Sequence, residues 1–207
     1  MAVPVESSHW RISRVRTSAQ VREAAAIVAE AFFTLRSAEW LVPDPEHRQA
    51  VLTDAFAITI THALDYGHVD QVTHPGGPMV AVAVWFHNAK PSPPPPNYGW
   101  RLRQVAGELT DRFQVRDALF DAHHPHEPHH YLALLAVRPA YQGALLGTAL
   151  LRHHRARLIA QQMPAYLEAV GLDSFRLYWN HGFRPHGDSF VLPNRARFYP
   201  MWRDPEV

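Results

Sequence analysis

The stretch from Leu132 to Leu151 constrains the fold more than any other part of the chain. It reads LALLAVRPAYQGALLGTALL, in which an unbroken apolar run ends at Arg-Pro, a glycine-bearing turn follows, and an Ala/Leu-rich helical segment begins. A buried strand, a turn and a helix in this order leave backbone N–H groups free at a helix N-terminus, where phosphate groups bind. The stretch therefore predicts a pyrophosphate site between a strand and a helix.

Composition narrows the class of protein. The 207 residues are 47% hydrophobic and 19% charged, which suits one globular domain over 1–207. A formal net charge of +1 gives no reason to bind nucleic acid or an anionic membrane. The lack of cysteine excludes a thiol nucleophile and a cysteine-based metal site. No apolar run has the length of a signal peptide core or a membrane span, so we expect a cytoplasmic protein.

The hydrophobic pattern predicts an α/β domain. Met79 to Phe86 is apolar throughout, which indicates a central strand buried on both faces. Lys90 to Asn97, KPSPPPPN, is typical of a polyproline II crossover on the surface. Further strands are expected over 10–16, 66–73 and 164–169, with a closing hairpin over 184–203. Helices are expected from a cap at Ser18 to Phe32 and over 46–64, 100–120 and 174–180.

A second motif follows the first along the chain. Tyr166-Leu167-Glu168-Ala169 precedes the segment SFRLYWNHGF, from Ser174 to Phe183. Together the two motifs resemble those of the GNAT acyltransferases, which move an acyl group from coenzyme A to an amine. The resemblance implies the GNAT fold: a mixed, twisted sheet of about seven strands with helices on both faces, and a central strand pair, 131–137 and 164–169, that splays apart.

The GNAT pyrophosphate loop has the pattern Arg/Gln-x-x-Gly-x-Gly/Ala. Gln142 and Gly147 match it, whereas Leu145 stands where the middle glycine belongs. We expect Leu145→Gly to tighten coenzyme A binding about tenfold and to cost roughly 0.5–1 kcal/mol of stability. The resemblance implies acetyl-CoA as acyl donor, held by Leu135, Ala136, Val137, Gln142, Gly143, Ala144, Leu145, Leu146, Gly147, Thr148 and Ser174.

Three residues are candidates for the chemistry. Tyr178 has the position of the tyrosine that protonates the departing thiolate in GNAT enzymes; the alternative is a packing role. Glu168 is either a general base or a buried structural carboxylate. His130, at the entry of the strand beside the thioester, is suited to deprotonate an ammonium group, although a solvated loop histidine is the alternative. Two prolines stiffen the loop from His123 to His130 against wrapping an ion, so we expect no metal.

A narrower resemblance is to the puromycin N-acetyltransferase-like group of GNAT proteins. It is carried by VPDPEHR, AVAVWF, HHPHEPHHYLALLAVRP, PAYLEA, LYWNHGF and RFYPMWR, in that order along nearly the whole chain. This implies transfer of an acetyl group by direct attack of a small-molecule amine, of antibiotic or natural-product type, in a monomer or homodimer. Two alternatives are a GNAT-fold binding module without acetyl-CoA chemistry and an acyltransferase that uses another acyl donor.

Overall fold

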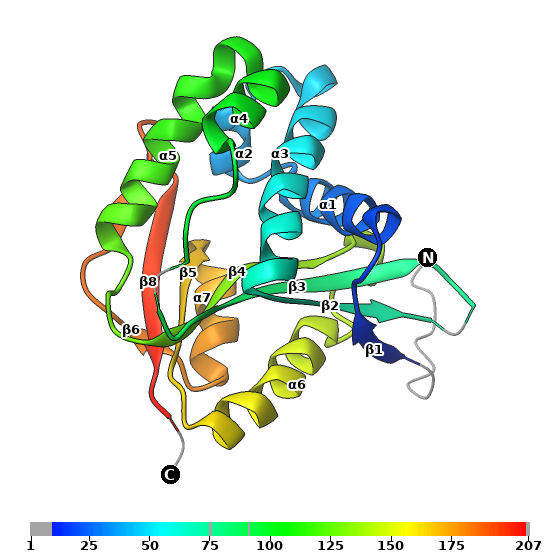
Figure 1. Ribbon diagram of the computed structural model, residues 1–207, viewed down its shortest axis with the longest axis vertical. Helices are drawn as coiled ribbons and strands as arrows, with labels where there is room; N and C mark the ends of the chain where they lie inside the picture. Colours follow the sequence, from blue (N-terminus) through cyan, green and yellow to red (C-terminus); the bar gives the residue numbers. More distant parts are fainter. Residues whose placement is uncertain (1–9, 75, 91, 206–207) are drawn as a thin grey trace.

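One mixed sheet organises residues 10–74, 76–90 and 92–205, the part of the chain that this computed structural model describes (Figure 1). Its eight strands run in the order β1-β2-β3-β4-β5-β8-β6, with β7 paired to β8. The prediction of about seven strands is confirmed. The sheet has eight strands, and two of these are only two residues long. The strands are β1 (Arg11–Arg14), β2 (Gly67–Thr73), β3 (Met79–Asn88), β4 (His129–Val137), β5 (Ala165–Val170), β6 (Arg184–Pro185), β7 (Phe190–Val191) and β8 (Arg197–Arg203).

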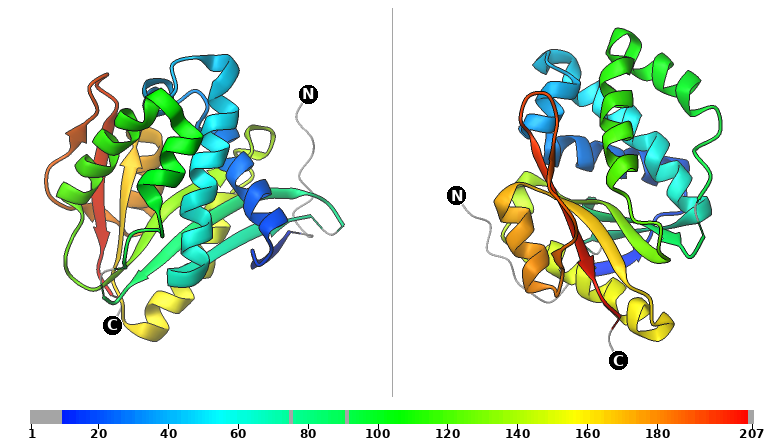
Figure 2. Two further views of the ribbon diagram at one scale, coloured as in Figure 1. Left: turned by 45° about the horizontal axis from the view of Figure 1, so that its top comes forward. Right: turned by 90° about the vertical axis from the view of Figure 1, so that its left-hand side faces the viewer.

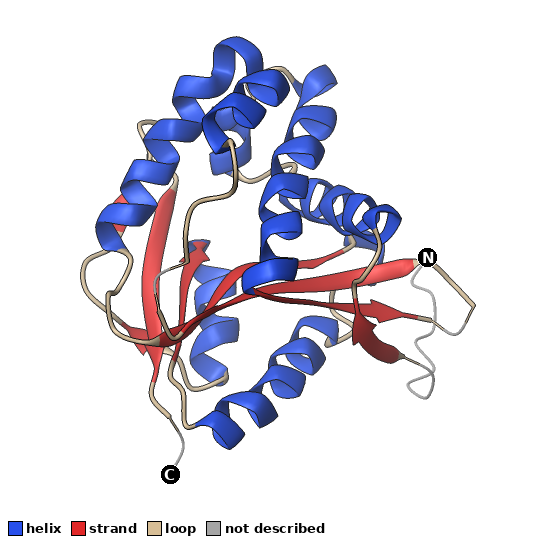
Figure 3. Ribbon diagram, in the orientation of Figure 1, coloured by secondary structure: helices blue, strands red, loops and turns tan. Residues whose placement is uncertain are grey.

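Helices cover both faces of this sheet, as predicted (Figures 2 and 3). Helices α1 to α5 lie on one face, whereas α6 and α7 lie on the other (Figure 1). None of the helices in the described residues is long and apolar enough to cross a membrane. The helices are α1 (Ser18–Phe32), α2 (Arg36–Leu41), α3 (Pro45–Tyr66), α4 (Tyr98–Ala106), α5 (Thr110–His123), α6 (Leu146–Gln161) and α7 (Gly171–Asn180), with short 3-10 turns η1 (Gly107–Leu109) and η2 (Pro139–Tyr141).

Local sequence signals explain where the first helices begin. The cap of α1 is Thr17 and not Ser18, because the Thr17 side chain accepts a hydrogen bond from the Gln20 N–H and Gln20 bonds back to the Thr17 N–H. The Asp44 side chain accepts from the Glu46 N–H and caps α3, and Pro45 occupies the first helical position, where a missing N–H costs nothing.

The single helix expected over 100–120 was wrong, because this region forms two helices. Gly107 lies between α4 and α5 with a φ of 52°, a value that favours glycine and cannot continue an α-helix. The chain passes through η1 before α5 begins at Thr110. The segment therefore turns a corner and covers a wider part of the α1–α5 face than one straight helix would.

Strand β3 is the centre of the core, as its sequence predicts. Val82, Val84 and Phe86 belong to the cluster under α1 to α5, whereas Ala83 and Trp85 belong to the cluster under α6 and α7. Both faces of the strand are therefore buried, and each carries its own hydrophobic core.

The central strands β4 and β5 are parallel and pair over two positions only. His130 lies opposite Ala165 and Tyr131 opposite Tyr166, after which the two strands separate. β4 continues to Val137 beside β3, and β5 continues to Val170 beside β8. The predicted splay is thus present, and it leaves one edge of β4 without a strand partner.

Candidate active site

A bulge in β4 determines which backbone groups face the splay. The register with β3 shifts between Val84 and Trp85, so that Ala133 has no partner across the ladder. Before the bulge, the His130 N–H donates to the Pro164 carbonyl on the β5 side; after it, the Arg138 N–H donates to the Val80 carbonyl on the β3 side. Without a bulge these two even-numbered residues would face the same way.

The bulge therefore changes the side of β4 to which the backbone groups of Leu135 and Val137 point. Because the Arg138 N–H points to β3, the backbone groups of Leu135 and Val137 point into the gap beside β5. The Val137 carbonyl accepts a hydrogen bond there from the Gln142 side-chain amide at 3.1 Å. The sequence-predicted strand residues therefore offer an open edge to an extended ligand.

The turn after β4 presents a row of free backbone donors. Within the described residues, the N–H groups of Gly143, Leu145, Leu146, Gly147 and Thr148 have no hydrogen-bond acceptor. Three of them belong to the first turn of α6, where helix geometry leaves N–H groups unsatisfied. A diphosphate at this helix N-terminus would satisfy these donors and interact favourably with the helix dipole.

Leu145 adopts a left-handed backbone conformation, which favours glycine. Its φ of 60° and ψ of 18° are left-handed, and its side chain is 72% exposed. An L-residue in this conformation costs about 1–2 kcal/mol, because its Cβ approaches the following carbonyl oxygen. This conformation reverses the expected effect of Leu145→Gly on stability, because glycine removes the strain.

We predict that Leu145→Gly raises the free energy of unfolding by up to about 1 kcal/mol, since the relieved strain offsets the added entropy of the unfolded chain. Binding of coenzyme A should tighten about tenfold, or ~1.4 kcal/mol, as the phosphates approach a loop without a Cβ. Urea unfolding and calorimetry measure the two effects.

Two neighbouring variants separate the causes. Ala144→Gly adds the same unfolded-chain entropy at a residue without positive φ, so it should destabilise the protein. Leu145→Ala removes bulk but keeps the strained backbone, so it should affect binding more than stability. If Leu145→Gly destabilises as much as Ala144→Gly, the strain is absent.

The start of α6 packs against β4 and α7. A Cβ at Gly147 would lie 3.7 to 4.0 Å from side-chain atoms of Leu135, Leu177 and Val137, so the loop is held close to the open strand edge. The Thr148 hydroxyl lies 3.3 Å from the His181 ring at the end of α7. The predicted loop and strand residues are thus brought together.

Ser174 lies on α7 and is turned toward its own helix. Its hydroxyl donates to the Val170 carbonyl at 2.6 Å. Its hydrogen-bonding capacity as a donor is therefore used inside the fold, and a role in binding the cofactor would rest on its oxygen lone pairs.

Tyr178 lies on the buried side of α7. Its ring packs edge-on against Phe183, with centroids 5.9 Å apart, in the same hydrophobic cluster as Leu135 and Val137. Burial raises the pKa of the phenol well above its ordinary value. The hydroxyl therefore stays protonated at neutral pH, as a proton donor must.

Glu168 is a buried carboxylate at the point where the strands part. Its side chain is only 2% exposed, and Oε1 has no hydrogen-bond partner in the described part of the chain. Burial raises the pKa of Glu168 to about 7, and the neighbouring hydroxyls of Tyr131 and Tyr166 limit that rise. Such a carboxyl can gain or lose a proton near neutral pH, which suits general base catalysis.

A cavity of about 540 Å³ reaches β4 from the α1–α5 face. Ala133 and Leu134, adjacent in sequence, both line it, which the bulge makes possible. Phenylalanine and tyrosine rings line it together with histidines, prolines, Arg116 and acidic residues. Its lining includes Phe56, Phe86, Phe120, Tyr131, Asp121 and Glu127.

His124 connects this cavity to Glu168. The ring lines the cavity, and its Nδ1 lies 4.0 Å from Glu168 Oε1. Its Nε2 lies 3.1 Å from Nε2 of His129, which lines the cavity too. Burial lowers the pKa of His124 to about 4, so the ring is neutral at pH 7.

The sequence predicted His130 as a candidate base but did not indicate His124. His130 faces the opposite side of the sheet, where its Nδ1 lies 2.9 Å from Nε2 of His154 on α6. Side chains alternate along a strand, so of the adjacent pair His129 and His130 only one can reach the cavity. His124 belongs to the same histidine-rich segment, but only the fold shows that the loop returns it to Glu168.

Comparisons with solved structures give the same architecture. A Corynebacterium glutamicum protein described as histone acetyltransferase HPA2 and related acetyltransferase is 26% identical, with 97% of this chain and 98% of that chain covered and a TM-score of 0.72. A Desulfovibrio desulfuricans protein described as an acetyltransferase of the GNAT family is 17% identical, with 94% and 98% covered and a TM-score of 0.56.

A third solved structure contains the cofactor that the sequence implies. The PaiA N-acetyltransferase of Thermoplasma acidophilum, in complex with coenzyme A, is 8% identical, with 95% of this chain and 99% of that chain covered and a TM-score of 0.58. No protein-family model matches the chain. These matches show that the chain has the GNAT fold, and they support its placement in the GNAT superfamily of acetyltransferases.

Proposed function

We propose that the domain 1–207 is an N-acetyltransferase that transfers an acetyl group from acetyl-CoA to the amine of a small molecule. One observation carries this proposal: the splay between β4 and β5 has free backbone donors on the α6 side and a cavity on the α1–α5 side. A donor and an acceptor could thus approach the same point from opposite faces, which is the geometry that direct transfer requires.

The residues fit an acyl-CoA molecule. The N–H groups from Gly143 to Thr148 are suited to its diphosphate, and the open backbone edge at Leu135 and Val137 is suited to the amide groups of its pantetheine arm. When bound, acyl-CoA supplies the acyl group as a thioester, which a neutral amine can attack.

Glu168 and Tyr178 would move the protons. A substrate amine enters mostly as ammonium, and Glu168, with a pKa near 7, can accept its proton directly or through the neighbouring His124 ring. Tyr178 remains protonated and would donate to the departing sulfur. We assign no proton transfer to His130, because its ring nitrogen bonds to His154 away from the cavity.

The cavity favours an alkyl amine that carries an aromatic group as acceptor. Rings of Phe56, Phe86, Phe120 and Tyr131 suit a flat apolar body, and the acidic Asp121 and Glu127 in the cavity lining suit a positive charge. About 540 Å³ is the size of a drug-like ligand. This supports the antibiotic or natural-product class, and with the sequence markers, the puromycin N-acetyltransferase-like group.

We expect the purified protein to release free thiol from acetyl-CoA only when a suitable amine is present. The test screens primary alkyl amines that carry an aromatic group, puromycin among them, with aliphatic polyamines and N-terminal peptides as comparison acceptors, and mass spectrometry identifies the N-acetyl product. Saturable coenzyme A binding without transfer to any amine would favour a binding module. Transfer that occurs only with acyl donors other than acetyl-CoA would overturn the assignment to acetyl-CoA.

A further inference from the structure

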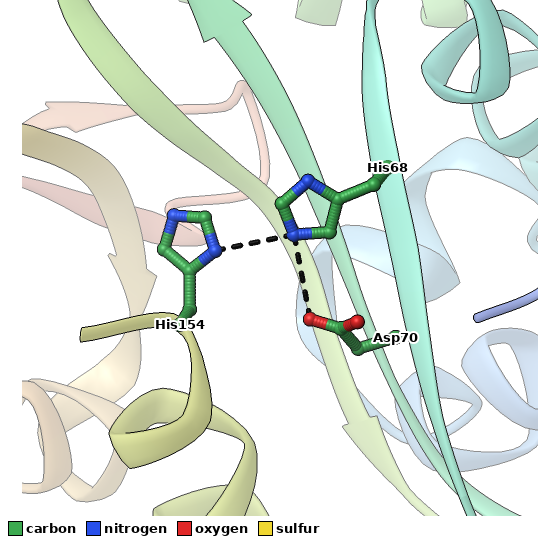
Figure 4. Close-up of side chains that lie close together, drawn as sticks. All are labelled: His68, Asp70 and His154. Carbon is green, nitrogen blue, oxygen red and sulfur yellow. Dashed lines mark hydrogen bonds and ion pairs between the residues drawn. The ribbon is translucent and has the colours of Figure 1, made fainter. Parts of the chain in front are cut away.

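A second cluster of polar side chains is buried under α6, away from the proposed active site. His68 and Asp70 project from β2, and His154 projects from α6 toward them (Figure 4). The side chains of His68 and Asp70 are 8% and 1% exposed, and His154 is 1% exposed. Two imidazoles and a carboxylate rarely share an apolar interior unless something compensates for their lost hydration.

The spacing of these three groups matches a metal site. His68 Nε2 lies 3.1 Å from His154 Nδ1 and 3.4 Å from Asp70 Oδ2, and one donor atom from each residue lies within 4.8 Å of the others. Tetrahedral bonds of 2.0–2.2 Å to zinc place neighbouring ligand atoms about 3.3 Å apart. The distances from His68 to the other two donors therefore already match those between zinc ligands.

The outer nitrogens of both histidines have partners of the right kind. His68 Nδ1 lies 2.7 Å from His87 Nε2, and His154 Nε2 lies 2.9 Å from His130 Nδ1. A metal-bound histidine typically donates its second N–H to an acceptor that fixes the ring. Here His87 and His130 can each accept that bond, and the Gln161 side chain bonds to His130 in turn.

Asp70 supplies an independent observation, because its buried carboxylate is not fully compensated. Neither of its carboxylate oxygens makes a hydrogen bond within the described residues. The Arg14 guanidinium lies 3.2 Å from Oδ1 and His153 lies 4.0 Å from the same oxygen, which leaves Oδ2 directed to His68. A cation at Oδ2 would satisfy the buried carboxylate while Arg14 holds its other oxygen.

We propose that His68, Asp70 and His154 bind a divalent first-row metal ion, with Zn²⁺ as the best-suited ion. Two imidazoles and one carboxylate form a common zinc ligand set, which a water molecule can complete. The ion would join α6 to β2 at mid-helix and so hold the helix whose N-terminus carries the phosphate loop. The expectation of no metal was based on the loop from His123 to His130, whereas these ligands lie on β2 and α6.

The test measures metal binding by the full chain after treatment with a chelator. Zinc titrated in competition with a chromophoric chelator should bind at one equivalent per chain and raise the melting temperature. Asp70→Asn and His154→Gln should weaken binding at least 100-fold, and His87→Ala by about 10–100-fold. His126→Gln, in the histidine-rich loop, should bind as wild type does.

Each alternative has its own result. Absence of saturable zinc binding by the wild-type protein would overturn the proposal, and so would loss of binding in His126→Gln with retention in His154→Gln. Circular dichroism identifies any variant that does not fold. If both ligand variants unfold, X-ray absorption of the zinc-loaded wild-type protein tests the proposal directly. The proposal requires two imidazole nitrogens with oxygen ligands around the zinc, and any other ligand set contradicts it.

Discussion

Replacement of Glu168 by glutamine should lower kcat by about 10²–10⁴-fold, the usual contribution of a positioned general base. Glutamine keeps the shape of the side chain but cannot accept a proton from the amine. The comparison variant is Glu108→Gln, which removes an exposed carboxylate in η1 and should leave kcat unchanged. Steady-state thiol release with the best amine measures both. Near-normal turnover in Glu168→Gln would exclude this residue as the base.

The pH profile gives a second readout of the same group. Protonated Glu168 cannot act as a base, so kcat/KM of the wild type should rise with pH through a midpoint near 7, the pKa of Glu168. Glu168→Gln should lose this limb and keep any limb at higher pH that belongs to the amine substrate.

Stability distinguishes lost chemistry from lost folding. The folded-state pKa of Glu168 is raised above its unfolded value, so its contribution to stability is fully present below the unfolded pKa and is lost as pH rises through about 7. Above that pH the buried charge destabilises the fold, and Glu168→Gln should be no less stable than the wild type. A lower melting temperature there would mean that the carboxylate is structural.

The second large effect is expected for Tyr178→Phe, which should lower kcat by about 10²–10⁴-fold if protonation of the sulfur limits the rate. The variant removes one hydroxyl from a ring that packs against Phe183, so the fold should survive. KM for acetyl-CoA should change little, because the hydroxyl would act mainly in the transition state. Rapid-quench measurement of the chemical step avoids masking by product release.

A matched control is available in the same hydrophobic cluster. Tyr199 on β8 is half-buried and packs edge-on against Phe175 of α7, and Tyr199→Phe removes the same group at the edge of the cluster. This control should retain kcat. Equal losses in both variants would indicate a packing effect, and an intact chemical step in Tyr178→Phe would mean that another donor protonates the thiolate.

The sequence predicted the parts of the fold that depend on local pattern. The apolar run of β3, the helix α3 and the strand-turn-helix at Leu132 to Leu151 all have strong signals at the correct spacing, and the structure confirms them. Gly107 was misjudged, because a single glycine within a helical pattern does not reveal its φ. The left-handed conformation of Leu145 was missed for the same reason, since periodicity carries no information on backbone dihedral angles.

Long-range contacts could not be predicted from the residues alone. His68, Asp70 and His154 lie on β2 and α6, 86 residues apart in the case of the two histidines, and no spacing rule connects them. The cavity likewise combines α3, α5 and β4, so its aromatic character emerges only once these elements pack. The role of Glu168 was left open between base and structural carboxylate, and its contact with His124 is what now favours the base.

The bulge at Ala133 divides β4 into two parts that contribute to different parts of the site. Its first part contributes side chains such as Tyr131 to the cavity, and its second part contributes the backbone of Leu135 and Val137 to the open edge. Selection or engineering for a new acceptor can therefore change cavity side chains on α3 and α5 while the donor edge, which depends on main-chain atoms, keeps its geometry. This division would let one scaffold diversify across many amines and retain a common acyl donor.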